Sequence, residues 1–270
     1  MTSVLLAGCG TMGGALLEGW LERGVQAEAV TVVEPSPDIA GALRRLGGLD
    51  VVGAPGDIGA DLRPGVVVFA VKPQAMDAVA PAYKRFAGPG TVFLSIAAGK
   101  TIGYFEDRLG ADAAIVRSMP NTPAAVRRGI TVACPNGLVT PDHQRLCHDL
   151  LEAVGEVAWV DDEALLDAVT AVSGGGPAYV FLLVECLARA GADAGLPADL
   201  ALRLARVTVS GAGELLHRST DAPEALRQSV TSPGGTTEQA LKVLMAADGW
   251  QPLLTRAIAA ATARSRELAG

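Results

Sequence analysis

A glycine-rich segment near the start of the chain has the residue types and spacing of a phosphate-binding loop. Residues 8–13 read Gly-Cys-Gly-Thr-Met-Gly, which matches G-x-G-x-x-G, and they lie between an apolar stretch and a helical pattern. In this context Gly8 permits a tight turn, Gly10 lets a pyrophosphate approach the backbone, and Gly13 lets the helix pack closely on the strand. The free amides at the helix start would hold the phosphate charge. The spacing therefore predicts a dinucleotide site, with a glycine turn that binds nothing as the alternative.

An acidic residue after the second apolar stretch bears on which dinucleotide is bound. Glu34 could bind both hydroxyls of an adenosine ribose, which favours NADH, and it would repel the 2′-phosphate of NADPH. Against this, Ser36 could donate to a phosphate, and Arg44 and Arg45 follow one helix later. Glu34 could also do no more than cap the strand end in solvent. The residues favour NADH and leave NADPH open.

Three further segments follow apolar stretches and could complete a cofactor site. They are residues 70–73 (Ala-Val-Lys-Pro), 95–99 (Ser-Ile-Ala-Ala-Gly) and 117–123 (Arg-Ser-Met-Pro-Asn-Thr-Pro). Ligands of parallel sheets lie beyond the carboxyl ends of the strands, so Lys72 can face such a cleft. The small residues at 95–99 would let a flat ring approach. Together with the glycine loop, these segments predict a dinucleotide crevice.

A second loop, residues 230–239, has the composition of a carboxylate-binding turn. Thr236 and Gln239 fit a capping box, which predicts that a helix starts there. Gly234 and Gly235 leave the preceding amides unobstructed, so the loop could bind an anion. Additional hydroxyl donors come from Ser232, Thr236 and Thr237. A well-capped helix start with no ligand is the alternative.

The apolar pattern that must position these segments predicts two domains. Short, almost continuously apolar stretches, typical of strands buried on both faces, lie at 4–7, 31–33, 66–71, 91–94, 114–116, 130–133 and 157–160. Helical patterns alternate with them at 12–23, 39–46, 75–86, 102–109 and 143–154. This alternation predicts an α/β domain over residues 1–160, with a Rossmann-type doubly wound parallel sheet. Residues 161–270 show helical patterns alone, at 164–194 (apart from a Gly-Gly-Gly-Pro interruption at 174–177), 199–217, 222–229, 237–245 and 252–268, which predicts an all-helical second domain.

One helix of the second domain predicts a partner subunit. Residues 179–187 are apolar on almost every side, apart from Glu185. Such a helix must be covered all round, so we expect a second copy of the chain to supply part of the cover, as a homodimer. A central helix in a monomeric bundle is the alternative.

The composition excludes several other classes of protein. Hydrophobic residues make up 50% of the chain and charged residues 19%, which excludes disorder. A net charge of -7 without a basic stripe predicts no nucleic-acid binding. The four cysteines form no CxxC pair, which predicts reduced thiols in a cytoplasmic protein. No signal peptide is recognisable, and the glycines at 174–176 argue against a membrane span. No metal constellation is present, and the three histidines are expected at the surface.

Taken in order, the segments at 8–13, 70–73, 118–123, 173–179 and 230–237 resemble the pyrroline-5-carboxylate reductase family, and 231–237 is the most family-specific of them. The resemblance implies reduction of the cyclic imine 1-pyrroline-5-carboxylate to L-proline by NADH or NADPH, the last step of proline biosynthesis. It also implies an N-terminal Rossmann domain and a C-terminal helical domain that interlocks into a homodimer. Dimers of this family often assemble into larger rings.

Carried over by position, the resemblance implies three groups of site residues. The pyrophosphate would be bound by Gly8, Gly10, Thr11, Met12 and Gly13, and Ser36 would lie near the adenosine ribose. The nicotinamide side would be bordered by Ala70, Val71, Lys72, Pro73 and Ala97. The substrate carboxylate and imine would be held by Ser232, Gly234, Gly235, Thr236 and Thr237.

Two positions depart from the family's pattern. The usual Ser-Gly-Ser-Gly-Pro-Ala-Tyr has Gly175 as its third residue here, which removes one hydroxyl. Glu34 is less expected in an enzyme that uses NADPH.

The predicted chemistry needs orientation more than a strong nucleophile, because hydride attacks a protonated imine readily. Thr237 is the predicted catalytic residue, since its hydroxyl could hydrogen-bond the imine nitrogen or relay a proton to it. Two other functions remain open. One is a reductase of another cyclic imine, such as the six-membered piperideine homologue, or of a keto acid. The other is a non-enzymatic dinucleotide sensor, which would have no reason for the 232–237 loop.

Overall fold

The computed structural model describes the backbone of residues 3–269, and the chain divides into two compact units. The first unit extends to Gly174 and takes in the residues from Thr262 onward. The second unit is Gly175–Ala261.

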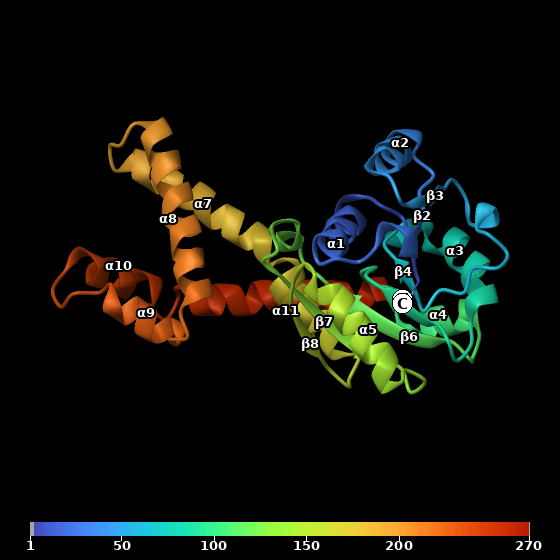
Figure 1. The fold of residues 1–270 in the computed structure, drawn as a ribbon. Helices are drawn as coiled ribbons and strands as arrows, with labels where there is room; N and C mark the ends of the chain where they lie inside the picture. Colours follow the sequence, from blue (N-terminus) through green and yellow to red (C-terminus); the bar gives the residue numbers. More distant parts are fainter. Residues whose placement is uncertain (1–2, 270) are drawn as a thin grey trace. The chain divides into compact units, whose positions relative to one another are not determined.

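One eight-stranded sheet, of order β3-β2-β1-β4-β5-β6-β7-β8, forms the centre of the first unit. Its strands are β1 (Val4–Ala7), β2 (Val30–Val33), β3 (Asp50–Val52), β4 (Val66–Phe69), β5 (Val92–Ser95), β6 (Ala114–Met119), β7 (Gly129–Pro135) and β8 (Gly155–Trp159). Figure 1 labels β2, β3, β4, β6, β7 and β8 of this sheet. The chain runs outward from β1 to β3 and returns to β4 on the other side of β1, so the strand order reverses between β1 and β4. This reversal is where doubly wound sheets bind their ligands.

The predicted Rossmann-type sheet is confirmed, and one strand pair differs from the prediction. Neighbouring strands are parallel, but β6 and β7 are antiparallel, with Arg117 opposite Cys134. Only residues 120–128 connect these two strands. A parallel crossover needs about a dozen residues or more, so this connection can only turn the chain back.

Helices cover both faces of the sheet. Alternate residues of each strand point to opposite sides, so each buried strand contributes side chains to two cores. Leu6 of β1 belongs to a core with α1 (Thr11–Glu22) and α5 (Pro141–Glu152). Its neighbour Leu5 belongs to the other core, with α4 (Ile102–Leu109) and residues 76–86. α2 (Pro37–Leu46) adds Leu43 to the first of these cores. The layers hold the strand ends, and therefore the loops of the site, in place.

Two elements of the first unit differ from their prediction. The short strand β3 was not expected, and none of its residues is fully buried. The helix expected over 75–86 contains a single α-helical turn, α3 (Met76–Val79), and continues as a 3-10 helix, Ala80–Phe86. Pro81 lacks the amide hydrogen that an α-helix needs at that position.

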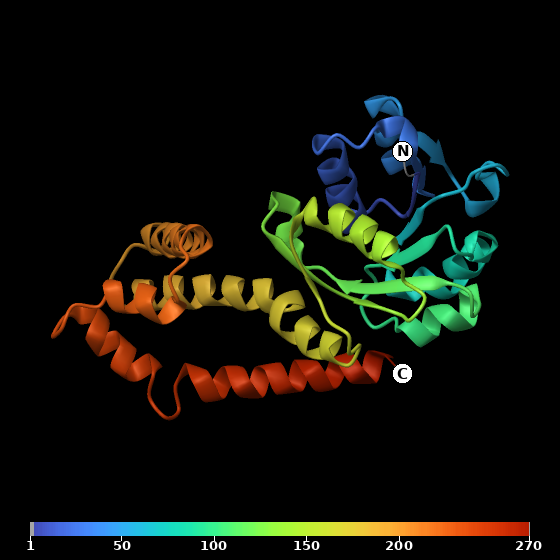
Figure 2. The same ribbon diagram turned by 60° about the horizontal axis from the view of Figure 1, so that its bottom comes forward.

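The second unit contains helices alone, as predicted, and Figure 2 shows coiled ribbons without arrows from α7 to α10. The helices are α7 (Gly176–Asp193), α8 (Ala198–Arg218), α9 (Pro223–Ser229), α10 (Thr236–Leu244) and α11 (Trp250–Ala269), of which the last eight residues belong to the first unit. α7 and α8 pack against each other, and a Cβ at Gly191 would lie 3.3 Å from Ala201 Cβ. α7 itself has no buried residue.

A continuous helical run, Leu165–Asp193, leads into the second unit. It comprises α6 (Leu165–Val169), a π-helical turn (Thr170–Gly174) and α7. The interruption expected at 174–177 therefore does not break the run: Gly174 ends the π turn and Gly176 begins α7. By length and composition alone the run could cross a membrane, with a mean hydropathy of 1.5 and 6% of its most apolar window buried.

Candidate active site

The glycine loop has the geometry that its spacing predicts. Gly8 follows β1 with a φ of 88°, a backbone conformation that favours glycine. A Cβ at Gly10 would meet no atom within 4 Å, so the loop is open at that point. A Cβ at Gly13 would collide with the Gly8 carbonyl oxygen and lie 3.1 Å from Ala70 Cβ. The loop thus combines tight packing at Gly13 with free space at Gly10, which fits the close approach of a dinucleotide.

The start of α1 supplies hydrogen-bond donors to this open space. Gly10 is the N-cap of the helix and makes no side-chain cap, and the first bond of the ladder runs from Gly14 N to Gly10 O at 2.7 Å. The amides of Thr11, Met12 and Gly13 have no acceptor within the helix. Met12 is half-buried and Thr11 is exposed. A helix start of this form is suited to an anionic group.

The other predicted cofactor residues lie at the same edge of the sheet. Ala70 directly follows β4, and its amide donates to Ala7 O at 2.8 Å. A Cβ at Gly8 would lie 2.7 Å from Val71 Cγ1, so the two strand ends pack together. Lys72 is exposed and precedes the short 3-10 helix Pro73–Ala75. Ala97 is buried beyond the end of β5. The structure therefore gathers them around the reversal between β1 and β4.

Glu34 is buried at the end of β2, with 6% of its surface exposed, and does not cap the strand in solvent. Its Oε2 accepts a hydrogen bond from the Cys9 amide at 2.8 Å, and its Oε1 accepts one from the Ser36 amide at 2.8 Å. The carboxylate therefore ties the glycine loop to the segment that begins α2. Burial, followed by the negative charges of Glu34 and Glu18, raises the pKa of the Cys9 thiol to about 11. That thiol is therefore protonated at neutral pH.

In the second unit, the predicted substrate loop forms a turn before α10. Gly234 has a φ of 73°, and the Gly235 amide donates to Ser232 O at 3.0 Å. The Thr231 hydroxyl donates to Arg227 O at 2.6 Å and so fixes the start of the turn. The side chains of Ser232, Thr236 and Thr237 are exposed. The loop thus presents its hydroxyls at the surface of the unit.

The capping box predicted for Thr236 and Gln239 is wrong. Gly235 is the N-cap of α10 and provides no side-chain acceptor. Instead, Glu238 Oε2 accepts a hydrogen bond from the Gly234 amide at 2.7 Å. The helix begins one residue earlier than the box requires, so the glutamate of the first turn reaches back to the loop.

Two carboxylates that hold site loops were missed at the level of the sequence. Glu238 is one, and Glu163 is the other. Glu163 accepts from the Ile102 amide at 2.8 Å and pairs with the buried Arg117 at 2.7 Å, which joins the start of α4 to β6. The buried arginine in an otherwise apolar strand was the signal that a partner is needed.

The histidines and the metal-ligating side chains form no further centre. His143 is buried, so its predicted surface location is wrong: its amide donates to Thr140 Oγ1 at 3.2 Å at the start of α5. His148 accepts from Trp159 Nε1 at 3.3 Å. Within residues 3–269, no group of three or more His, Cys, Asp or Glu side chains could hold a metal ion.

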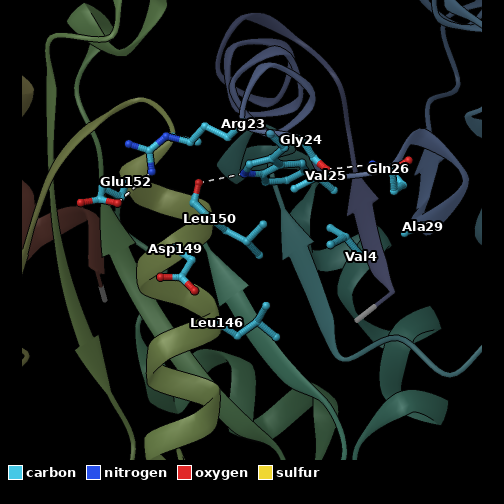
Figure 3. Close-up of a pocket in the computed structure, with 12 residues that line it drawn as sticks. Val4, Arg23, Gly24, Val25, Gln26, Ala29, Leu146, Asp149, Leu150 and Glu152 are labelled. Carbon is cyan, nitrogen blue, oxygen red and sulfur yellow. Dashed lines mark hydrogen bonds and ion pairs between the residues drawn. The ribbon is translucent and has the colours of Figure 1, made fainter. Parts of the chain in front are cut away.

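A cavity of about 460 Å³ lies at the opposite edge of the sheet, beside Val4 at the amino end of β1 (Figure 3). Its wall includes Trp20, whose Nε1 donates to Leu150 O at 2.8 Å, and the Arg23–Glu152 ion pair at 2.8 Å. Trp20 and Arg23 thus each have a polar partner within the wall. The cavity is separate from the glycine loop, which follows the other end of β1.

Relatives of known family match this chain over nearly its whole length. A pyrroline-5-carboxylate reductase of Pseudomonas aeruginosa is 40% identical over 266 residues, which cover 98% of this chain and 96% of the relative. The chain belongs to the pyrroline-5-carboxylate reductase family. A relative of the same name from Escherichia coli is 37% identical over 240 residues, which cover 88% of this chain and 87% of that relative.

Family models and solved structures agree with this membership. A model described as pyrroline-5-carboxylate reductase dimerisation matches residues 163–268, and one described as NADP oxidoreductase, coenzyme F420-dependent, matches residues 3–99. A pyrroline-5-carboxylate reductase structure from Coxiella burnetii superposes with a TM-score of 0.93 at 34% identity, covering 100% of this chain and 99% of that one. A Plasmodium falciparum pyrroline carboxylate reductase solved with NADP bound has a TM-score of 0.81 at 28% identity, covering 100% of this chain and 98% of that one.

Proposed function

We propose that this chain catalyses the NAD(P)H-dependent reduction of 1-pyrroline-5-carboxylate to L-proline. The observation that carries the proposal is family membership over 98% of the chain, together with a glycine loop whose geometry fits a dinucleotide. Bound NADH or NADPH supplies the hydride, and the protein supplies binding, orientation and a proton path.

In the proposed cofactor site, the first unit holds the dinucleotide at the reversal between β1 and β4. The amides at the start of α1 bind the pyrophosphate, and Gly10 leaves room for it. Glu34 and Ser36 lie at the ribose position after β2. The segment 70–73 and Ala97 border the nicotinamide.

In the proposed substrate site, the loop before α10 holds the imino acid. The free amides of Thr236 and Thr237 at the start of α10 bind the carboxylate, together with the hydroxyls of Ser232, Thr236 and Thr237. Gly234 and Gly235 form the turn that presents these groups to the ring. The Thr237 hydroxyl hydrogen-bonds the imine nitrogen and assists its protonation, which makes the imine carbon a better hydride acceptor.

The Thr237 role is tested by replacing it with alanine and with serine. Thr237→Ala should lower kcat by about 10²-fold or more, within the range of one lost proton-transfer group, and leave the melting temperature unchanged because the side chain is exposed. Thr237→Ser should restore most of the turnover. Thr255→Ala, an exposed threonine of α11, serves as the control. Wild-type turnover in Thr237→Ala would remove the residue from the mechanism.

The alternatives are separated by steady-state oxidation of NADH and NADPH. Oxidation that starts only when 1-pyrroline-5-carboxylate is added excludes a dinucleotide sensor. A higher kcat/KM for the six-membered imine or for a keto acid would assign the chain another substrate.

We also propose that the chain forms a homodimer in the cytoplasm and that any larger ring is built from these dimers. The dimer is expected to bind neither nucleic acid nor membrane. The proposed boundary places the cofactor site in residues 1–160 and the substrate site and dimer contacts in 161–270. A dimerisation model that begins at residue 163 supports this division. The exposed apolar side chains of α7, among them Phe181 and Leu182, would be covered by the second copy rather than by lipid.

A further inference from the structure

The end of β2 carries a carboxylate that the main chain holds in one place. Glu34 bonds the Cys9 amide through one oxygen and the Ser36 amide through the other, both at 2.8 Å. With 6% of its surface exposed, it has little room to turn away. A group placed beside this carboxylate must therefore tolerate its charge and its acceptor oxygens.

The backbone after Glu34 offers few donors to an anion. Pro35 and Pro37 have no amide hydrogen. The amide of Ser36 is bonded to Glu34, and the amide of Glu34 itself donates to Val52 O at 3.0 Å. The Ser36 hydroxyl and the amides of Asp38 and Ile39 at the start of α2 remain, and Asp38 brings a second carboxylate.

The neighbouring charges do not compensate for these carboxylates. The sequence has no lysine or arginine between Arg23 and Arg44. Arg44 Nη2 donates to Val51 O at 3.1 Å, and both Arg44 and Arg45 lie in the last turn of α2 rather than at its start. The turn after β3 adds Asp57 and no cation.

These contacts separate the two nicotinamide cofactors, which differ at the adenosine 2′ position. A carboxylate has about four acceptor positions, so Glu34 keeps one on each oxygen for ribose hydroxyls. A 2′-phosphate would instead bring negative charge beside the buried, fixed carboxylate of Glu34 and the exposed carboxylate of Asp38, with few donors to compensate. Building on the proposed function, we infer that Glu34 makes this chain selective for NADH over NADPH.

Binding is the direct test. With the full-length wild-type protein, calorimetric titration should give a Kd for NADP⁺ at least about tenfold higher than that for NAD⁺. With 1-pyrroline-5-carboxylate as substrate, kcat/KM should likewise be higher for NADH than for NADPH. An equal or lower Kd for NADP⁺ would overturn the inference. Absence of imine-dependent oxidation with either cofactor would instead overturn the proposed function and leave the binding ratio standing.

Variants assign the selectivity to its residues. Glu34→Gln should bring the two Kd values to within about threefold, mainly by improving NADP⁺ binding. Asp38→Asn, an exposed change that keeps the bonds of Glu34, should narrow the ratio by a smaller factor. Glu28→Gln, at the other end of β2, is the matched control and should leave the ratio unchanged. If Glu34→Gln keeps its melting curve and the ratio of the two Kd values does not change, and if Asp38→Asn does not change the ratio either, then Glu34 is not the residue that determines selectivity.

Discussion

The two units differ in how their apolar side chains are covered. In the first unit, the same chain buries both faces of the central strands of the sheet, and residues such as Leu5, Leu6 and Phe93 are at most 1% exposed. In the second unit, α7 has no buried residue, and Phe181 and Leu215 are 63% and 67% exposed. One chain therefore buries the apolar core of the first unit by itself, whereas the apolar side chains of the helical unit need a second surface to cover them.

The two candidate loops differ in the same way. Main-chain and carboxylate contacts surround the glycine loop, where Gly8 and Cys9 are buried. Most of the loop before α10 is exposed, and its described contacts come from its own helix and from α9. One loop is thus shaped by the sheet, and the other is shaped locally.

The largest effect is expected from a charge placed on α7. Phe181→Asp should dissociate the dimer, because each copy loses about 1.5–3 kcal/mol of apolar burial and gains a desolvated carboxylate. Light scattering after size exclusion should show a monomer or an aggregate. Leu46→Asp is the matched control, because Leu46 is also 63% exposed but lies in the first unit, and this variant should stay dimeric. A dimeric Phe181→Asp would place the interface elsewhere.

Two glycines of the glycine loop are expected to have different roles, one in packing and one in ligand binding. Gly13→Ala should cost about 1–3 kcal/mol, because its Cβ collides with the Gly8 carbonyl oxygen, and should lower the melting temperature. Gly10→Ala should leave that temperature nearly unchanged, because its Cβ enters open space, and should weaken NADH binding in calorimetry. Equal melting temperatures for the two variants would contradict the assigned roles.

The smallest expected effect concerns an exposed contact of the first unit. A hydrogen bond from Arg23, aided by its charge, holds the pKa of Glu152 below its usual 4.5. Because the folded pKa lies below the unfolded one, the pair stabilises the fold above pH 4.5, and this contribution is lost as the pH falls through the folded pKa. Arg23→Gln should raise the Glu152 pKa in an NMR titration, whereas Arg145→Gln, elsewhere on α5, should not.

Local patterns predicted most of the fold and much of the cofactor edge. The short, continuously apolar run 66–71 and the helical period of 102–109 made their strand and helix recognisable. β3 was missed because Asp50–Val52 is short and only half-buried, and the antiparallel β7 because its direction depends on connection length. His143 was misplaced because burial depends on packing against other elements.

The residue order alone determined the elements of the glycine loop and the exposed turn before α10, since both depend on backbone rules that act within a few residues. It could not decide what Glu34 touches, because Cys9 lies 25 residues away and meets it only when β1 and β2 pair. Nor could it decide that Glu238 accepts a hydrogen bond from the Gly234 amide, in place of a capping box between Thr236 and Gln239. Hydrogen bonds of that kind depend on distances that exist only once the chain has folded.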